Sequence, residues 1–302
     1  MTFAGTSFSG TPHVGNAIPS PGAMSAPGAG FDPVCDPARL VHTLGEESLL
    51  SRAALAETTA RLPAAMIERR VHDAADGADF RILPACGDLP KRLAEGGPES
   101  EWVMLKGLEQ VPEYAALFAQ LIEGLPGSIL AATGPVRDLK AFVFLSAPHT
   151  HTPLHFDAEY NVLFQIEGTK TFTTFPPRDP FVTLAARETY HRSGDNLIAP
   201  DAAHETGGMP HALAPGDALY VPYCAPHSVR CGPLASISLS LTWQDDWSRD
   251  VAEAVRLGPL LRRCGLAPRD PGLSRRRPRL AALASRMAGR VARIGRIPGY
   301  GA

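Results

Sequence analysis

The chain has 302 residues, of which 44% are hydrophobic and 20% are charged, and its formal net charge is -2. This composition is typical of a globular protein and excludes a fibrous or wholly disordered chain. Five scattered cysteines without a Cys-x-x-Cys pair argue against a disulfide framework, and the chain has no run of eighteen apolar residues that would predict a membrane span. We therefore expect a cytoplasmic protein with no membrane partner.

Three regions differ in composition. Residues 1–36 are rich in Gly, Pro, Ser, Thr and Ala without helical or strand periodicity, which predicts a flexible segment. Residues 37–245 carry the strand patterns and are predicted to form one folded domain with helices at its N-terminal side. Residues 246–302 are predicted to be helical, and from position 275 onward they contain eight arginines and no acidic residue.

The patterns along the chain predict a mainly β fold with flanking α-helices. Helices are predicted over 46–66 and 112–125, and short strands over 102–105, 128–131, 140–145, 160–166, 170–175, 218–221 and 235–243. Glu167-Gly168 is interpreted as a hairpin turn between two strands, Pro215-Gly216-Asp217 as a second turn, and residues 176–210 as a loop-rich insertion. Many short strands separated by turns favour a sandwich or barrel over a parallel α/β sheet.

The last two helices are predicted around Val251–Leu261 and Leu280–Ile294, the second with an apolar stripe at helical spacing. Such a stripe would suit a homodimer contact. Arginines on a solvated helix face are common, so nucleic acid is not the expected partner, although an RNA-directed role is a third hypothesis for the basic tail.

A candidate metal site follows from three side chains. Residues two apart on a strand face the same side, so His155 and Asp157 are predicted to converge on one ion. His227, 70 residues after Asp157, is predicted to supply the third ligand. Two histidines and one carboxylate leave coordination positions open for substrates, whereas a structural zinc site closes its coordination shell.

Other histidines offer alternatives to this ligand set. His204 and His211 are rival third ligands, but both precede the turn at Pro215-Gly216-Asp217. His149 and His151 also repeat at a spacing of two, which would allow a site with four ligands.

Across 139–243 the sequence resembles the cupin-like branch of the jumonji (JmjC) oxygenases, which includes the asparaginyl hydroxylase that acts on hypoxia-inducible factor. The resemblance is carried by Thr152-Pro153, His155-Phe156-Asp157, Asn161, Gln165-Ile166, Gly168, Lys170, Phe175-Pro176-Pro177, Pro215-Gly216-Asp217, Leu219-Tyr220, Pro222 and His227. It implies a double-stranded β-helix (cupin or jelly-roll) core over the catalytic domain. It also implies Fe(II) as the metal and 2-oxoglutarate as a co-substrate.

The same resemblance assigns roles to three further residues. Lys170 would pair with the far carboxylate of 2-oxoglutarate, Thr152 would donate a hydrogen bond to it, and Asn161 would lie near the iron or the co-substrate. The family's polar residue on the last core strand has no clear counterpart, because that strand matches only at Trp243. A cation is physically reasonable here, since an acidic co-substrate in an apolar barrel needs one.

The resulting hypothesis is a dioxygenase that hydroxylates a side chain of a peptide or protein and releases succinate and CO2. A hydroxylase of a small metabolite is the close alternative. A non-catalytic cupin-like binding module is the alternative from another class of protein.

Overall fold

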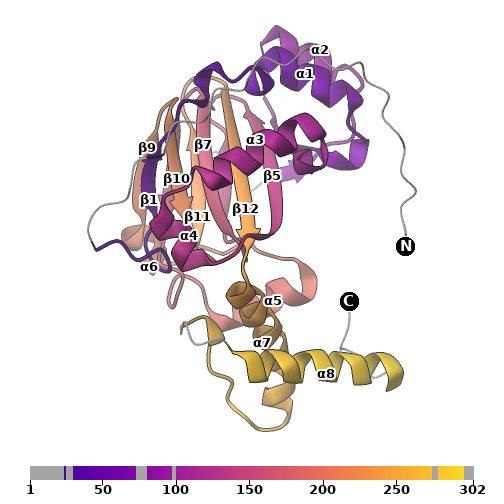
Figure 1. Cartoon of the computed structure of the whole chain (residues 1–302), viewed down its shortest axis with the longest axis vertical. Coiled ribbons are helices and arrows are strands. Elements are labelled where there is room, and N and C mark those ends of the chain that lie inside the picture. Colours follow the sequence, from indigo (N-terminus) through magenta and orange to yellow (C-terminus); the bar gives the residue numbers. More distant parts are fainter. Residues whose placement is uncertain (1–23, 25–29, 73–79, 97–99, 274–277, 296–302) are drawn as a thin grey trace.

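The strands form two antiparallel sheets that face each other (Figure 1). The structure is a computed structural model that describes residues 24, 30–72, 80–96, 100–273 and 278–295. The large sheet has the strand order β1 (Ala38–Val41), β10 (Asp217–Val221), β7 (Tyr160–Glu167), β12 (Ser236–Gln244), β5 (Arg137–Ser146), β4 (Trp102–Lys106), β2 (Ile67–His72) and β3 (Phe80–Ile82). The small sheet has the order β6 (His151–His155), β11 (His227–Cys231), β8 (Lys170–Thr174) and β9 (Met209–Leu213).

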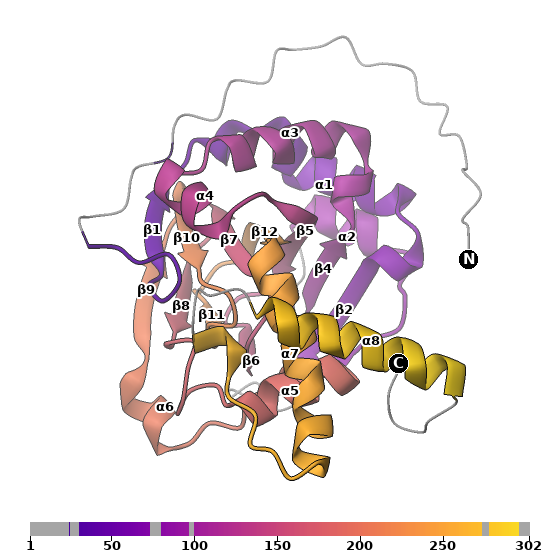
Figure 2. The same cartoon turned by 60° about the horizontal axis from the view of Figure 1, so that its bottom comes forward.

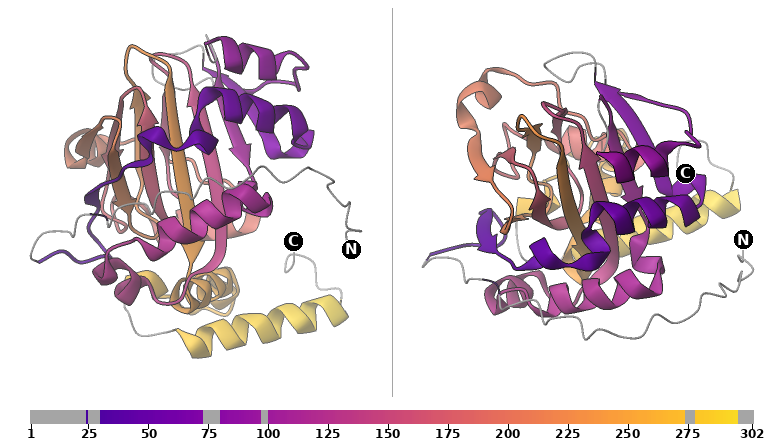
Figure 3. Two further views of the ribbon diagram at one scale, coloured as in Figure 1. Left: turned by 45° about the horizontal axis from the view of Figure 1, so that its top comes forward. Right: turned by 90° about the horizontal axis from the view of Figure 1, so that it is seen from above.

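The helices gather on the outer face of the large sheet and at one end of the barrel (Figures 1 and 3). They are α1 (Arg52–Arg61), α2 (Leu89–Glu95), α3 (Pro112–Glu123), α4 (Gly127–Thr133), α5 (Leu184–Ser193), α6 (Ala202–Gly207), α7 (Asp246–Arg263) and α8 (Arg279–Gly295). The mainly β fold with flanking helices is confirmed, and two facing antiparallel sheets are consistent with a jelly-roll core.

Strand β12 shows how the sequence builds the two faces of the large sheet. It pairs with β5 along one edge and with β7 along the other, and its residues from Ser236 to Trp243 are buried on both faces of the sheet. Its residues alternate between hydroxyl side chains and large apolar ones, and successive strand residues point to opposite faces. Leu239 and Leu241 belong to the main apolar core, whereas the hydroxyl residues Ser240 and Thr242 line a cavity between the sheets.

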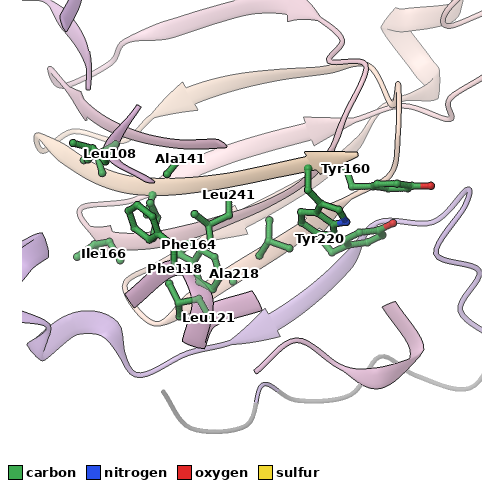
Figure 4. Close-up of a cluster of buried hydrophobic side chains, with 14 of the residues drawn as sticks. Leu108, Phe118, Leu121, Ala141, Tyr160, Phe164, Ile166, Ala218, Tyr220 and Leu241 are labelled. Carbon is green, nitrogen blue, oxygen red and sulfur yellow. The ribbon is translucent and has the colours of Figure 1, made fainter. Parts of the chain in front are cut away.

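The main core lies between the large sheet and helix α3. Phe118 and Leu121 of this helix point toward Phe164 and Leu241 of the sheet (Figure 4). Removing such apolar area from water contributes roughly 25 cal/mol per Å². This layer therefore anchors the large sheet, and the inner face of the sheet is free to carry polar groups.

Predicted helix 112–125 is confirmed, but two other elements differ from the sequence prediction. The predicted helix 46–66 is broken: 3-10 turns flank α1, whose N-terminus is capped by the Ser51 side chain and which ends before Pro63. The predicted strand 128–131 is instead part of α4, which follows Pro126 and ends at Gly134. A run of four mostly apolar residues does not distinguish a buried strand from a buried helix turn.

The predicted hairpin at Glu167-Gly168 is also wrong. Strand β7 lies in the large sheet and β8 in the small one, so the chain crosses between sheets at this point. Gly168 has φ +69°, and a Cβ there would lie 2.5 Å from the carbonyl oxygen of Ala235. Only glycine fits both requirements without displacing the neighbouring backbone.

The insertion, the N-terminal segment and the C-terminal helices agree with the sequence predictions to different degrees. The insertion 176–210 is not only loop, because it contains α5 and α6. Of the N-terminal segment 1–36, most lies outside the described residues, but Met24 is buried and the Pro33 carbonyl accepts a hydrogen bond from Tyr220 Oη. Helices α7 and α8 lie where the sequence predicted them, at the end of the barrel that Figure 2 brings forward.

Among the described helices, none alone has the length and apolar composition of a membrane span. Helices α3 and α4 meet those criteria only as a pair bent by 98°. Their apolar residues Leu117, Phe118 and Ile129 are buried within this fold.

Candidate metal and co-substrate site

Three side chains from the small sheet and the loop after it converge at one point. His155 is the last residue of β6, and His227 is the first residue of the neighbouring β11 and its register partner. Asp157 lies two residues beyond the end of β6, so it is not on the strand as the sequence argument assumed. One ligand atom from each of the three lies within 4.8 Å of the others.

The backbone fixes the orientation of both imidazoles. Nδ1 of His155 lies 2.8 Å from the carbonyl oxygen of Pro153, and Nδ1 of His227 lies 3.0 Å from that of Ala225. A carbonyl only accepts, so each Nδ1 is the donor, and the tautomer of the neutral ring that fits this contact has its lone pair on Nε2. This is the arrangement in which the second ring nitrogen of a histidine orients the first toward a metal.

Packing and charge keep His227 neutral. Its ring stacks on Phe172 at 4.8 Å between centroids, and its Nε2 lies 3.7 Å from Oδ2 of Asp157. Burial, together with the nearby His155, lowers the pKa of His227 to about 4, and Asp157 opposes this only in part. At neutral pH the side chain is therefore an imidazole, the form that binds metals.

Asp157 is held through its backbone and through its side chain. Its backbone carbonyl accepts a hydrogen bond from the amide of Cys224, and its Oδ1 accepts one from Asn196 Nδ2 at 3.3 Å. Oδ2 is left facing His227. The aspartate thus presents one oxygen toward the two histidines and the other toward a neutral donor.

Asn196 belongs to a short segment that extends the small sheet beyond β6. Its carbonyl accepts from the amide of Phe156, the amide of Ile198 donates to the carbonyl of Leu154, and Leu197 forms a bridge with His155. The insertion between β8 and β9 therefore closes the open edge next to the two ligands. Sequence patterns gave no signal for this contact, because 41 residues separate Asn196 from His155.

A cavity of about 760 Å³ extends from the three side chains between the two sheets. Its walls combine aromatic and aliphatic residues with a few polar groups, and they include Trp102, Phe144, Thr152, His155, Asp157, Asn161, Leu163, Lys170, Phe172, Asn196, Leu197, His227, Ser240 and Thr242. All six residues predicted for the site line this one cavity. Concave, mostly apolar pockets with a few convergent polar groups are the usual form of small-molecule sites.

Lys170 points into the cavity from β8. Its Nζ donates a hydrogen bond to Ser238 Oγ at 2.6 Å and lies 5.7 Å from the ring centre of Phe144. Burial lowers the pKa of its ammonium group, and no acidic side chain within the described residues forms an ion pair with it. A buried cation of this kind is costly unless an anion joins it.

Asn161 and Thr152 occupy the wall on either side. Asn161, on β7, accepts a hydrogen bond from Ser240 at 2.6 Å, and Thr152 lines the cavity from β6. From the sequence, the family's polar residue on the last core strand had no clear counterpart; in the structure Ser238 bonds Lys170, and Ser240 and Thr242 line the cavity from this strand. The alternation of β12 was the signal that would have identified them.

The rival histidines lie elsewhere. Nε2 of His211 contacts the Thr174 hydroxyl, and His204 is occupied by the capping box of α6 with Asp201. His149 is exposed and His151 is not among the three clustered ligands. Within the described residues, no second group of three metal-binding side chains gathers in this way.

A second hollow, of about 780 Å³, lies where α5, α7 and α8 meet the end of the barrel. Its charged residues pair with one another, as Arg286 does with Asp250 and Arg256 with Glu253. The clustered metal-binding side chains of the described residues all line the other cavity, the one between the sheets. That cavity is therefore the candidate site.

The comparisons with known families give one match. Residues 108–246 match the family model of the cupin-like domain. The match includes every residue of the candidate site. No curated protein sequence matches the chain.

Among solved structures, the chain is similar to YcfD, a ribosomal oxygenase from Escherichia coli in complex with cobalt and 2-oxoglutarate (16% identity, 76% of this chain and 54% of that chain, TM-score 0.47). A second structure of E. coli YcfD has 16% identity over 87% of this chain and 65% of that chain, with a TM-score of 0.49. The DMSP lyase DddQ from Ruegeria pomeroyi DSS-3 has 20% identity over 36% of this chain and 39% of that chain, with a TM-score of 0.24. The chain thus spans between half and two thirds of the length of the two YcfD structures.

Proposed function

We propose that the protein is an Fe(II)- and 2-oxoglutarate-dependent oxygenase that hydroxylates a side chain of a peptide or protein. The observation that carries this proposal is the meeting of two features in one cavity. A His-Asp-His set lies in its wall, and a buried lysine that forms no ion pair with any acidic side chain in the described part of the chain points into it.

The residues fit the implied metal and co-substrate. His155, Asp157 and His227 offer two neutral nitrogens and one carboxylate oxygen without a thiolate, which is the donor set typical of non-haem iron with open positions. Lys170, with Ser238 beside it, would bind the far carboxylate of 2-oxoglutarate, and Thr152 and Asn161 would contribute polar contacts. When bound, Fe(II) with 2-oxoglutarate and dioxygen supplies the oxidising power for C–H hydroxylation and yields succinate and CO2.

The shape of the cavity supports a peptide or protein as the oxidised substrate. The large sheet continues beyond β5 through β4 and β2. Glu68 and Arg70 of β2 and Trp102 and Met104 of β4 extend the wall of the cavity in this direction. A surface that runs outward from the reaction site suits a substrate larger than the cavity, whereas a metabolite would need only the inner part.

Turnover of 2-oxoglutarate tests the proposal. Purified protein with Fe(II), 2-oxoglutarate and oxygen should form succinate when peptide pools are added, and His227→Ala should abolish both Fe(II) binding and succinate formation. His211→Ala is the matched control, because this histidine lies on the small sheet but outside the ligand set, and it should retain both.

The outcomes separate the alternatives. Succinate formed with metabolite pools but not with peptide pools would replace the protein substrate by a small molecule. Binding of Fe(II) and 2-oxoglutarate without succinate from either pool would favour a non-catalytic cupin-like binding module.

A further inference from the structure

Helix α8 presents its large apolar side chains to solvent. Leu280, Leu283 and Met287 are 85%, 52% and 58% exposed, although they follow one another at helical spacing on one face. Single exposed apolar residues are common on protein surfaces, but a contiguous row marks an interaction site.

The helix is held in the fold by its opposite, small-residue face. Ala282 is fully buried and Ser285 is 3% exposed, and Ser285 Oγ contacts Glu253 of α7. Arg286 pairs with Asp250 of α7 at 2.7 Å, which fixes the rotation of the helix about its axis. A helix that packed only to complete this domain would bury its large apolar side chains. In α8 the buried positions are instead Ala282 and Ser285, and the leucines and the methionine are exposed.

The charge of this region restricts what can cover the row. Residues 275–302 contain eight arginines and no acidic residue. Arg279 stands next to the exposed row at the start of α8, whereas Arg286 is already paired with Asp250 of α7. A partner must therefore offer an apolar layer and negative charge together.

The position of the helix agrees with a flat partner. Helix α8 lies at the end of the molecule where α7 leaves the barrel, and it crosses in front of α7 in both views (Figures 1 and 2). Its exposed row faces away from α7, so an extended surface can approach it without meeting the barrel first.

We propose that α8 docks in the plane of a lipid bilayer that contains anionic phospholipids. The leucines and the methionine enter the boundary between headgroups and acyl chains, and the arginines bind the phosphate groups. No membrane partner was predicted from the sequence, because that prediction considered only apolar runs long enough to span a bilayer. This inference is independent of the proposed oxygenase activity and does not require an occupied metal site.

Two other partners fit the observations less well. A second copy of the chain would cover the apolar row, but two arginine-rich helices without acidic residues would be brought together. An RNA would satisfy the arginines, but its phosphates would leave Leu280, Leu283 and Met287 in water. Both remain distinct outcomes of the test.

The test is co-sedimentation of the full chain with vesicles of phosphatidylcholine alone or with added phosphatidylglycerol. We expect binding to the anionic vesicles only, weakened by salt because arginine–phosphate attraction is screened. The double variant L283S/M287S should bind about tenfold less, since two apolar side chains no longer enter the lipid. Leu234→Ser is the matched control: Leu234 is 69% exposed in the β11–β12 turn, at the other end of β12 from α7, and its loss should change nothing.

Light scattering and an RNA-binding assay on the same samples identify the other partners. A dimer that L283S/M287S converts to a monomer, with no vesicle binding by either protein, would overturn the proposal in favour of a second copy. RNA binding that the double variant retains, again without vesicle binding, would overturn it in favour of nucleic acid. Equal binding of wild type and double variant to anionic vesicles would also overturn it, because the apolar row would then have no role.

Discussion

Nζ of Lys170 donates a hydrogen bond to Oγ of Ser238 across the interior of the barrel, at 2.6 Å. The lysine belongs to the small sheet and the serine to the large one, so this bond joins the two sheets. It also fixes the position of the buried cation beside the cavity wall. The inner end of the cavity is therefore shaped for a negatively charged group before any ligand arrives.

Replacing Lys170 should weaken the binding of 2-oxoglutarate without changing the binding of the metal. In Lys170→Met the apolar stem keeps most of its volume, but a charge-assisted hydrogen bond to the carboxylate of 2-oxoglutarate is lost. We expect the Kd of 2-oxoglutarate to rise about 10- to 100-fold, with unchanged Co(II) affinity, by calorimetric titration. Thr171→Ala, on the exposed side of the same strand, is the control. Loss of Co(II) binding in the lysine variant would contradict the assigned role.

The same substitution should change how stability depends on pH in the ligand-free protein. Burial lowers the pKa of Lys170 below its ordinary 10.5. Between the lowered pKa of the folded protein and 10.5, this lysine is therefore mostly protonated in the unfolded chain and mostly neutral in the folded one. Folding stability contributed by this group is lowest at pH values below the folded pKa, and it rises as pH increases toward 10.5. Lys170→Met lacks this dependence.

Urea denaturation at a series of pH values checks this sign. The stability advantage of Lys170→Met over wild type should shrink as pH rises through that window. An advantage that stays constant, or that grows with pH, would show that the folded environment does not disfavour the charged lysine.

Asn196 should act as a positioning residue for Asp157. Removing its amide in Asn196→Ala frees the carboxylate to rotate, and we expect Co(II) affinity to fall about 10- to 100-fold, as for other groups that orient metal ligands. Asn196→Asp should be worse, because it places a second negative charge next to Oδ1. Arg192→Ala in the same insertion is the control. Equal affinities for the alanine variant and wild type, measured by Co(II) absorption titration, would remove Asn196 from the site.

Gly168 should be indispensable for the crossing between the sheets. Gly168→Ala places a Cβ against the carbonyl of Ala235 at a positive φ. The comparison is Gly265→Ala, which shares a positive φ of +75° but meets nothing within 4 Å. We expect about 1–2 kcal/mol of lost unfolding free energy for Gly265→Ala and clearly more for Gly168→Ala. Equal losses in urea denaturation would mean that the backbone at Ala235 moves away freely.

The sequence allowed the fold class and the three clustered side chains to be predicted, since both depend on local patterns. Period-two alternation marks strands wherever one face is buried, and the spacing from His155 to Asp157 needs only short-range geometry. Residues 128–131 were misassigned because four residues satisfy a strand and a helix turn equally well. The flanking Pro126 and Gly134 carried the deciding information.

Contacts between residues far apart in the chain could not be predicted from these local patterns. Whether the turn at Gly168 makes a hairpin or a crossing depends on which sheet receives β8, and β8 pairs with residues far along the chain in β9 and β11. The role of Asn196 likewise depends on how an insertion folds back on β6. Ser238 and Ser240 were readable from the alternation of β12, but their meaning required knowing that β12 is central in its sheet.

Residues 196–198 have two roles at once: the Asn196 side chain supports Asp157, and the same three residues form part of the cavity wall. An engineer who grafts this insertion from another cupin-like protein, to redirect which molecule enters, would exchange the amide behind the carboxylate at the same time. Under the proposed function, such a graft would change substrate choice and metal retention together. Libraries that vary the insertion should hold position 196 constant and diversify its neighbours.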